Sequence, residues 1–389
     1  MCVLAIFCGG SLIGTSIHAQ EASETIPSSS DRFEQPTERY SRAKVLSITK
    51  EGEREIAGYS NFFQNLSVKI LSGEEKGKTV AVEYGGVFNI SPHQKLIQGD
   101  TVVLIKSTEL SGKSSYFIMD RYRLPAVTYI IVGFFLLVFL VAGKKGFGAI
   151  LGLIISLFVI LNFIVPQIIH GSDPLMISIA GSLIIVFTTI FLAHGFSKKT
   201  AVALVATLIS LILTGILAVF FVAITRLTGL GSEDSYLLQF GPEGINLQGL
   251  LLGGIIIGAL GVLDDITTAQ SAAIFEIFKA NSTLPLRELI KRGMSVGREH
   301  VASLVNTLVL AYAGVSLSLF ILFVLNPSKQ PYWVILNSEV IIEELVRTLA
   351  GSIGLTLAVP ITTLLAAWVA VTFYTDSKKH IKRTFKTNK

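Results

Sequence analysis

Long apolar runs constrain the fold of this chain more than any other feature of its sequence. About seven of them reach about 20 residues, the length of helix that crosses the hydrocarbon core of a membrane. They lie near residues 125–143, 147–166, 174–194, 200–225, 245–263, 301–325 and 350–374. The chain has 51% hydrophobic and 15% charged residues, and a mean hydropathy of +0.64. Soluble proteins carry about 25% charged residues, so we expect an α-helical polytopic membrane protein with about seven transmembrane helices.

Basic residues predict the orientation of these helices, because lysine and arginine concentrate in cytoplasmic loops. Every second loop between the runs is rich in them, and the intervening loops are poor. The basic groups are Lys144 and Lys145, then Lys198 and Lys199, then Lys279, Arg287, Lys291, Arg292 and Arg298, and finally the tail DSKKHIKRTFKTNK. We therefore expect the part before the first run to lie outside the cytoplasm and the C-terminus to lie inside.

The N-terminal third has a different pattern. Residues 1–19 are typical of a signal peptide or an N-terminal anchor, and the polar residues 20–40 predict a disordered linker. Short β-rich runs then follow within residues 41–122: AKVLSIT, LSVKIL, KTVAVEY, TVVLIK and SYFIMDR. Turn sequences separate them, which predicts a small extracytoplasmic β-barrel of OB-like size. Residues 123–389 form the transmembrane helical domain with its basic cytoplasmic tail.

Metal, cofactor and nucleic-acid sites are not expected. The chain has 2 cysteines, Cys2 and Cys8, both in the N-terminal segment. His93 stands alone, whereas a metal site needs several ligands. The net charge of +5 is explained by the basic residues that set the topology. The lipid bilayer is the expected environment.

The stretch GALGVLDDITTAQSAAIFEI, residues 258–277, places adjacent carboxylates at the end of an apolar run. Helical spacing gives each acid its own stripe of small or polar residues. The first stripe is Asp264, Thr267, Thr268 and Ser271, and the second is Asp265, Ala269, Ala272 and Glu276.

Three interpretations of the acid pair are open. Ionisable groups within a membrane are costly and usually mark the path of an ion or a proton. Alternatively, the span ends at residue 263 and Asp264 caps an interfacial helix. In the third interpretation the acids form a structural ion pair with Arg298 or Arg347.

Glycines upstream of the acids are spaced for close packing of helices. Gly249 and Gly253 form one small-xxx-small pair, Gly254 and Gly258 form another, and Gly261 follows. Such pairs let helix backbones approach closely in lipid. They would serve a bundle within one chain or an interface between two copies equally well.

Polar residues recur in REHVASLVNTLVLAYAGVS. Asn306 lies about two turns into this span, where an unpaired amide is expensive, so a hydrogen bond between helices is its structural role. His300, Ser303 and Thr307 share its face. The preceding residues 281–299 predict an amphipathic helix on the cytoplasmic surface.

The last polar stretch surrounds EELVRTLAGSIGLTLAVPITT. Residues 334–349 predict an interfacial or re-entrant helix, in which Glu343 and Arg347 have the spacing of an ion pair. Glu344 has no such partner. Pro360 predicts a kink or break in the last span, and transporters often place binding sites at interrupted helices.

These three stretches resemble the YibE/F family of bacterial membrane proteins. The resemblance covers nearly the whole chain after residue 19 and includes a small β domain before the spans. It implies a multi-pass protein of the bacterial cytoplasmic membrane and assigns no catalytic residues. GVLDDITTAQSAAIFE is also similar, more faintly, to the acidic stretch that relays protons in RND transporters and their protein-export relatives.

The function we expect is an ion-coupled transporter or permease that uses intramembrane carboxylates. The candidate path comprises Asp264, Asp265, Thr268, Gln270, Glu276, Asn306, Glu343, Glu344 and Arg347. The alternative is a scaffold without transport, in which the outer β domain recruits an envelope protein. The partners we expect are such an envelope protein or, in a homo-oligomer, a second copy of the chain. An enzyme is not expected, because GxSxG, HExxH and GxGD-type signatures are missing from the sequence.

Overall fold

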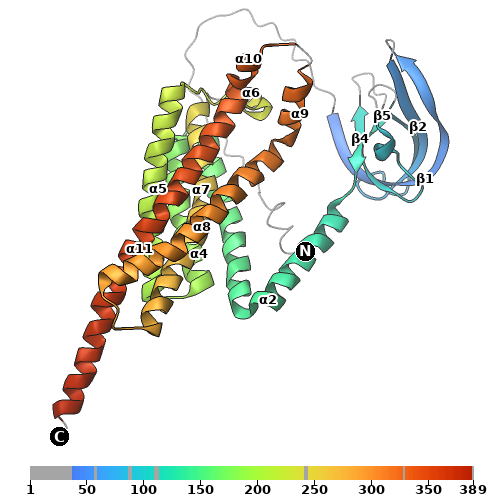
Figure 1. The fold of residues 1–389 in the computed structure, drawn as a ribbon. Helices are drawn as coiled ribbons and strands as arrows, with labels where there is room; N and C mark the ends of the chain where they lie inside the picture. The colour runs from blue at the N-terminus through green and yellow to red at the C-terminus, as the bar shows by residue number, and fades with distance from the viewer. Residues whose placement is uncertain are drawn as a thin grey trace, which may run out of the picture. The chain divides into compact units, whose positions relative to one another are not determined.

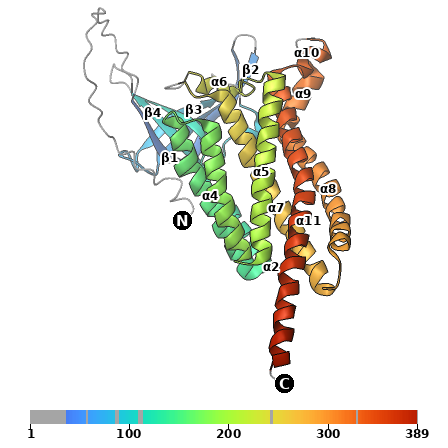
Figure 2. The same cartoon turned by 90° about the vertical axis from the view of Figure 1, so that its left-hand side faces the viewer.

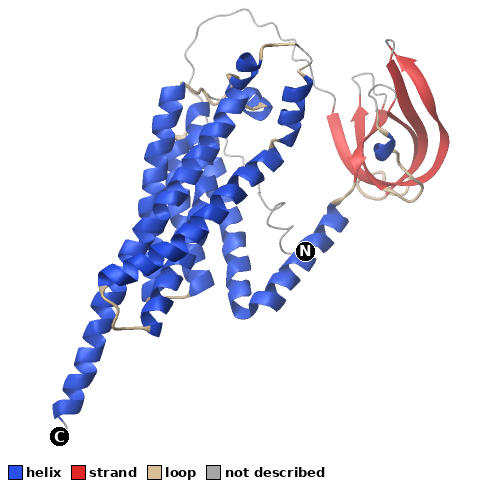
Figure 3. Cartoon of the chain, viewed as in Figure 1, coloured by secondary structure: helices blue, strands red, loops and turns tan. Residues whose placement is uncertain are grey.

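The computed structural model of the chain describes residues 37–56, 59–85, 90–108, 114–240, 244–326 and 329–387. These residues form two compact units that divide between Leu136 and Leu137. The N-terminal unit contains strands and the C-terminal unit is helical (Figure 3). The predicted signal segment and most of the predicted linker lie outside the described residues.

The β unit is a five-stranded half-barrel, with antiparallel neighbours in the order β3-β2-β1-β4-β5. Its strands are β1 Thr37–Ile56, β2 Tyr59–Ile70, β3 Thr79–Gly85, β4 Thr101–Thr108 and β5 Ser114–Arg121, with the short helix η1 Pro92–Gln94 before β4. All the strands fall where the β-rich runs predict them, although β1 begins within the range assigned to the linker. The OB-like assignment stays a prediction.

Alternation of apolar residues builds the core of this unit, because successive side chains of a strand point to opposite faces. Val45, Val68 and Leu104 are almost fully buried on the inner face. The long strand β1 has register shifts after Val45 and after Ile48. Such bulges increase the local bend of a strand, which lets β1 pair with both β2 and β4.

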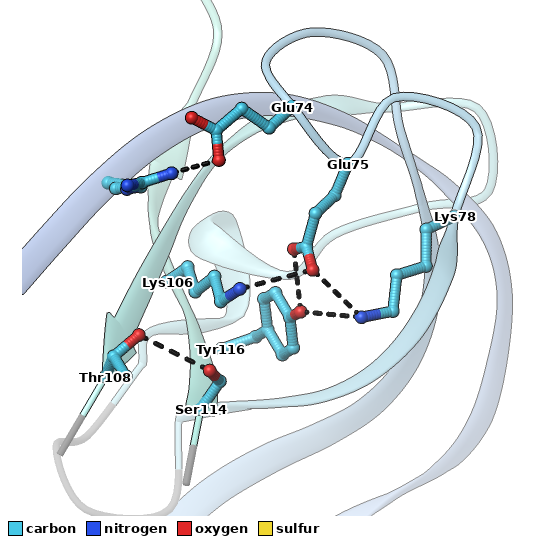
Figure 4. A network of polar contacts seen from close by, with 8 residues as sticks. Glu74, Glu75, Lys78, Lys106, Thr108, Ser114 and Tyr116 are labelled. Atoms are coloured by element: carbon cyan, nitrogen blue, oxygen red, sulfur yellow. Dashed lines mark hydrogen bonds and ion pairs between the residues drawn. The ribbon is translucent and has the colours of Figure 1, made fainter. Parts of the chain in front are cut away.

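A polar network joins the β2–β3 connection to β4 and β5 (Figure 4). The Tyr116 hydroxyl donates to Glu75 Oε2 at 2.8 Å, and Lys78 Nζ donates to Tyr116 Oη and to Glu75 Oε1, both at 3.0 Å. Lys106 Nζ lies 3.2 Å from the same oxygen of Glu75. The Tyr116 hydroxyl and the Lys78 ammonium lower the pKa of Glu75 to about 2. The network therefore ties the two edge strands of the half-barrel together through an ionised carboxylate.

The helical unit contains long helices that run side by side (Figure 1). The elements are α2 Leu124–Val159, the π-helix η2 Ile160–Ile164, α3 Val165–Ile169, α4 Pro174–His194, α5 Lys198–Thr225, α6 Glu233–Leu238, α7 Leu247–Ala280, α8 Leu286–Val315, α9 Leu317–Leu325, α10 Tyr332–Leu336 and α11 Glu339–Thr387. Among the described residues, five helical segments are long and apolar enough to cross a membrane. The chain is therefore a helical membrane protein.

The spans differ in detail from the seven predicted ones. Two predicted spans fall within the single segment Leu124–Ile169, although Gly143 has non-helical angles, φ 56 and ψ −133. The predicted span 301–325 is not straight, because α8 and α9 are bent by 65° relative to each other. The predicted surface helix 281–299 is the first half of α8. Counting the bent pair as one span gives up to six spans in the described chain.

Helices α5, α7 and α11 form the centre of the helical unit and lie together in both views (Figures 1 and 2). Apolar side chains such as Leu211, Leu263 and Val359 are buried where they meet. Helix α11 runs through Pro360 without the predicted break. It also begins at Glu339, so the second half of the predicted helix 334–349 belongs to the last span.

Candidate functional site

Helix α7 continues through the acid pair, from Leu247 to Ala280. Asp264 therefore does not begin a helix, and the interpretation in which it caps an interfacial helix after residue 263 is wrong. At a rise of about 1.5 Å per residue, Asp264 lies about 26 Å along the axis from the start of α7. This distance is shorter than the thickness of a bilayer core, about 30 Å.

Asp264 is poorly supplied with hydrogen-bond donors. Its Oδ2 accepts one long hydrogen bond, from Thr189 Oγ1 of α4 at 3.4 Å. Its Oδ1 is buried and has no partner among the residues that the structure describes. The expected ion pairs of the acids with Arg298 or Arg347 are not found among these residues either. A buried carboxylate normally has several strong donors, so this one is incompletely solvated by the protein.

Close packing of α2 on α4 positions this site. A Cβ added at Gly148 would lie 2.3 Å from Leu192 O, and one added at Gly152 would lie 3.5 Å from Thr189 Cα. These glycines form a small-xxx-small pair that allows two backbones to touch. The contact fixes the part of α4 that carries Thr189, which faces Asp264. Gly148 and Gly152 were not among the predicted packing glycines, although their spacing in the sequence is the same as that of the predicted pairs.

The predicted glycines of α7 divide into two groups. A Cβ added at Gly253 would lie 2.4 Å from Ser178 Oγ, and one at Gly249 would lie 3.2 Å from Pro174 Cδ, so these two pack against α4. Gly254, Gly258 and Gly261 are exposed in the single chain. Nothing described lies within 4 Å of a Cβ added at Gly254 or Gly261, and the Tyr312 hydroxyl lies 3.8 Å from one at Gly258.

A cavity of about 270 Å³ lies between α2, α4, α5 and α7. Its lining combines basic, hydroxyl and alanine side chains: Lys145, His194, Lys199, Thr200, Thr268, Ala203, Ala269 and Ala272. Thr268, one helical turn beyond Asp264, donates its hydroxyl to the Asp264 carbonyl at 2.8 Å. Asp265 is exposed, and its charge interacts with that of His194. The cavity and the acid pair thus share one section of α7.

Buried hydroxyls and an amide continue from this section into the bundle. Thr207 of α5 and Thr267 of α7 are fully buried and share a hydrogen bond of 2.6 Å. Gln270 is also fully buried and donates to Gly293 O at 2.9 Å and to Thr363 Oγ1 at 2.8 Å, while its Oε1 has no described partner. Gln270 therefore joins α7 to α8 and α11 and does not line the cavity.

Sequence reasoning missed the α5 side of this polar core. Thr200, Thr207, Ser210 and Thr214 are all buried. Thr200, Thr207 and Thr214 recur every seven residues, a spacing that keeps side chains on one face of a helix. This repeat is the sequence signal that would have predicted a polar face on α5.

Other predicted residues lie elsewhere. Glu276 is exposed near the end of α7 and pairs with Lys279 at 2.7 Å. Asn306 is exposed on α8. The expected hydrogen bond from its side chain to another helix is not found in the described part of the chain. Neither residue is brought to the acid pair.

The predicted acids of α11 lie at the other end of the bundle. Glu343 is 6% exposed and its Oε1 accepts from Gly231 N at 2.9 Å. The expected ion pair of Glu343 with Arg347 is not formed. Instead, Arg347 Nη1 lies 3.6 Å from Glu344 Oε2. Because Gln270 bonds to Thr363, Glu343 lies about 30 Å along α11 from the level of Gln270, and about 20 Å from the level of Asp264.

Fold and site define a helical membrane protein with an under-coordinated carboxylate beside a cavity. Comparison with known proteins then gives the family. The model of the family described as YibE/F-like protein matches residues 130–372, and the chain belongs to this family. No curated protein and no solved structure matches the chain.

Proposed function

We propose that the protein is an ion-coupled transporter in which Asp264 alternately binds and releases a proton or a small cation. The observation that carries this proposal is the buried Oδ1 of Asp264, which has no partner among the described residues. An ionised carboxylate without donors costs several kcal/mol inside a protein, even after relaxation and water penetration. The site is therefore most stable with a proton or a cation bound, and it can release either one when water reaches it.

The surroundings of Asp264 supply a route for exchange. On one side, Thr268 lines the cavity between α2, α4, α5 and α7. On the other side, the Thr207–Thr267 pair leads into the buried polar core. Asp265, the next residue, adds a second negative charge that favours binding of a cation over an anion at Asp264. We assign Asp264 and Asp265 to binding, and we assign Gln270 to joining the helices around them.

Topology and location complete the proposal. If Gly143 divides Leu124–Ile169 into two spans and the bent pair is one span, the total is the expected seven. The basic loops then support a β unit outside and a C-terminus in the cytoplasm of a bacterial cell. The strand order, with a short helix before β4, supports an OB-like barrel. We propose no covalent chemistry for this protein.

Proton and cation movement by the full chain in proteoliposomes tests the function. An imposed pH or Na⁺ gradient is followed with a trapped pH dye and with charge-displacement currents. Asp264→Asn should reduce the signal about tenfold or more, which corresponds to at least about 1.4 kcal/mol. Glu276→Gln is the matched control, because it removes a carboxylate from the surface of the same helix. Equal signals from the wild type and Asp264→Asn would overturn the proposal.

The scaffold hypothesis remains a second candidate because the β unit is compact and has its own core. It proposes that this unit recruits an envelope protein. Deletion of residues 41–122 should then abolish the cellular phenotype, whereas Asp264→Asn should leave it intact. The transporter proposal expects loss of the phenotype with Asp264→Asn.

A further inference from the structure

The cavity beside the acid pair gathers positive charge that the proposed cation site does not use. Lys145 precedes the close contact of α2 with α4, His194 ends α4, and Lys199 lies in the first turn of α5. We propose that this cavity binds a phosphate-type oxyanion. The inference does not depend on transport, because it concerns binding alone.

The two ammonium groups of the cavity have no ion-pair partner in the described part of the chain, although Asp265 attracts His194 and Glu276 attracts Lys199 at longer range. Among the described residues that line it, none is acidic. Neither the Lys145 nor the Lys199 ammonium forms a hydrogen bond or an ion pair with another described side chain, whereas Lys279 and Arg292 on neighbouring surfaces do. Like charges held together in this way are stabilised by an anion between them.

The local backbone adds to the positive potential. Helix α5 has 28 residues, and its N-terminus is at the cavity, where Ser197 caps the helix by accepting from Thr200 N at 3.2 Å. The N-terminal end of a long helix carries a partial positive charge and favours anions. This end of α5 converges with the ammonium groups of Lys145 and Lys199 and with the imidazole of His194.

The shape of the cavity suits a compact ligand. Ala203, Ala269 and Ala272 line the cavity together with the basic residues. Their short side chains leave the space of about 270 Å³ open. Lysine is a common phosphate ligand because its ammonium acts as a mobile point charge. Asp265 does not line the cavity but interacts with His194, so we place the oxyanion on the lysine side.

Basic residues near the ends of spans also follow from topology alone, and a matched variant separates the two explanations. Lys144 and Lys291 are exposed and do not line the cavity. The variant Lys145→Gln/Lys199→Gln and the control Lys144→Gln/Lys291→Gln each remove two positive charges. All four lysines belong to the basic segments expected on the cytoplasmic side. Only the first pair should affect a cavity ligand.

Titration calorimetry of the purified full chain with inorganic phosphate provides the first arm. We expect saturable binding that Lys145→Gln/Lys199→Gln weakens at least tenfold and the control pair changes less than twofold. Ala269→Leu fills the cavity without a change of charge and should weaken binding as well. This variant keeps the test decisive if the double lysine variant fails to fold.

Lipid phosphate is the second possible source of the oxyanion. Nanodiscs of phosphatidylglycerol and phosphatidylcholine, followed by native mass spectrometry, show whether an anionic lipid stays bound. Retention by the wild type and the control, with loss in both cavity variants, would assign the site to a lipid headgroup. The inference is overturned if neither phosphate nor phosphatidylglycerol binding changes in the cavity variants.

Discussion

Asp264 in the helical unit and Glu75 in the β unit are both carboxylates in polar networks, but they differ in the number and strength of their hydrogen-bond donors. Glu75 receives donors from Tyr116, Lys78 and Lys106 at 2.8 to 3.2 Å. Asp264 receives one donor, at 3.4 Å, and one of its oxygens has no partner in the described chain. The side chain of Glu75 is also 27% exposed.

This difference separates a structural acid from one that is suited to exchange. Charge-assisted hydrogen bonds hold Glu75 in its ionised form and in one orientation. Asp264 lacks such donors, so its charge state is set by what enters the site. Glu343 is an informative intermediate, because it is buried but accepts from a backbone N–H.

Asp264→Asn should produce the largest functional change and no loss of stability. The amide removes a carboxylate that the protein solvates incompletely, so the free energy of unfolding should stay the same or rise. Reversible unfolding in detergent micelles measures this change beside the flux assay. A clear loss of stability would show that Asp264 is a structural acid like Glu75.

Glu343→Ala should lower the free energy of unfolding by about 1–3 kcal/mol, because Gly231 N–H would lose its buried acceptor. Glu343→Gln keeps an acceptor oxygen and should retain most of the stability. The same micelle assay compares the two variants. If Glu343→Ala abolished flux without loss of stability, Glu343 would act in ion movement, as proposed for Asp264, and would not be a structural acid.

Neighbouring glycines of α7 provide a comparison without charge. Gly253→Ala places a Cβ against Ser178 and should cost about 1–3 kcal/mol. Gly254→Ala meets nothing described within 4 Å and should gain up to about 1 kcal/mol from helix propensity. Thermal unfolding measures both variants. A large cost at Gly254 would reveal a partner surface, such as a second copy of the chain.

Glu75→Gln should have the smallest effect, less than about 1 kcal/mol, because its network is partly exposed. The folded pKa of Glu75 is about 2, below the ordinary value of 4.5. The stabilisation is therefore complete above about pH 4.5 and is lost as the pH falls towards about 2. Hydrogen exchange of β3 and β5 in the full chain should show this loss in the wild type. An identical pH profile in Glu75→Gln would contradict the assignment.

Local patterns predicted much of this fold. Alternation gave all the strands, because one face of each strand is buried and the other is not. Hydropathy predicted the apolar helices, because a helix that crosses a membrane is apolar along about 20 residues. The bend between α8 and α9 was not predictable, since the run 301–325 is apolar on both sides of Ser316.

The site was predictable in part. The acid pair stood out because charge is rare in apolar sequence, and the structure places it beside a cavity. The partners of the acids were not predictable. Thr189 and Lys145 reach the site through the contact of α2 with α4, which depends on Gly148 and Gly152. The pairing of Arg347 with Glu344, in place of Glu343, likewise follows from the loop that engages Glu343.

The segment between α5 and α7 has a mechanical consequence. Glu339 accepts from Thr228 and Gly229, Glu343 accepts from Gly231, and Gln248 donates to Leu227 O at 2.7 Å. One short turn therefore clamps the end of α5 to the beginnings of α7 and α11. Any rocking motion that opens the bundle at that end must carry these three helices as a single block or break the clamp.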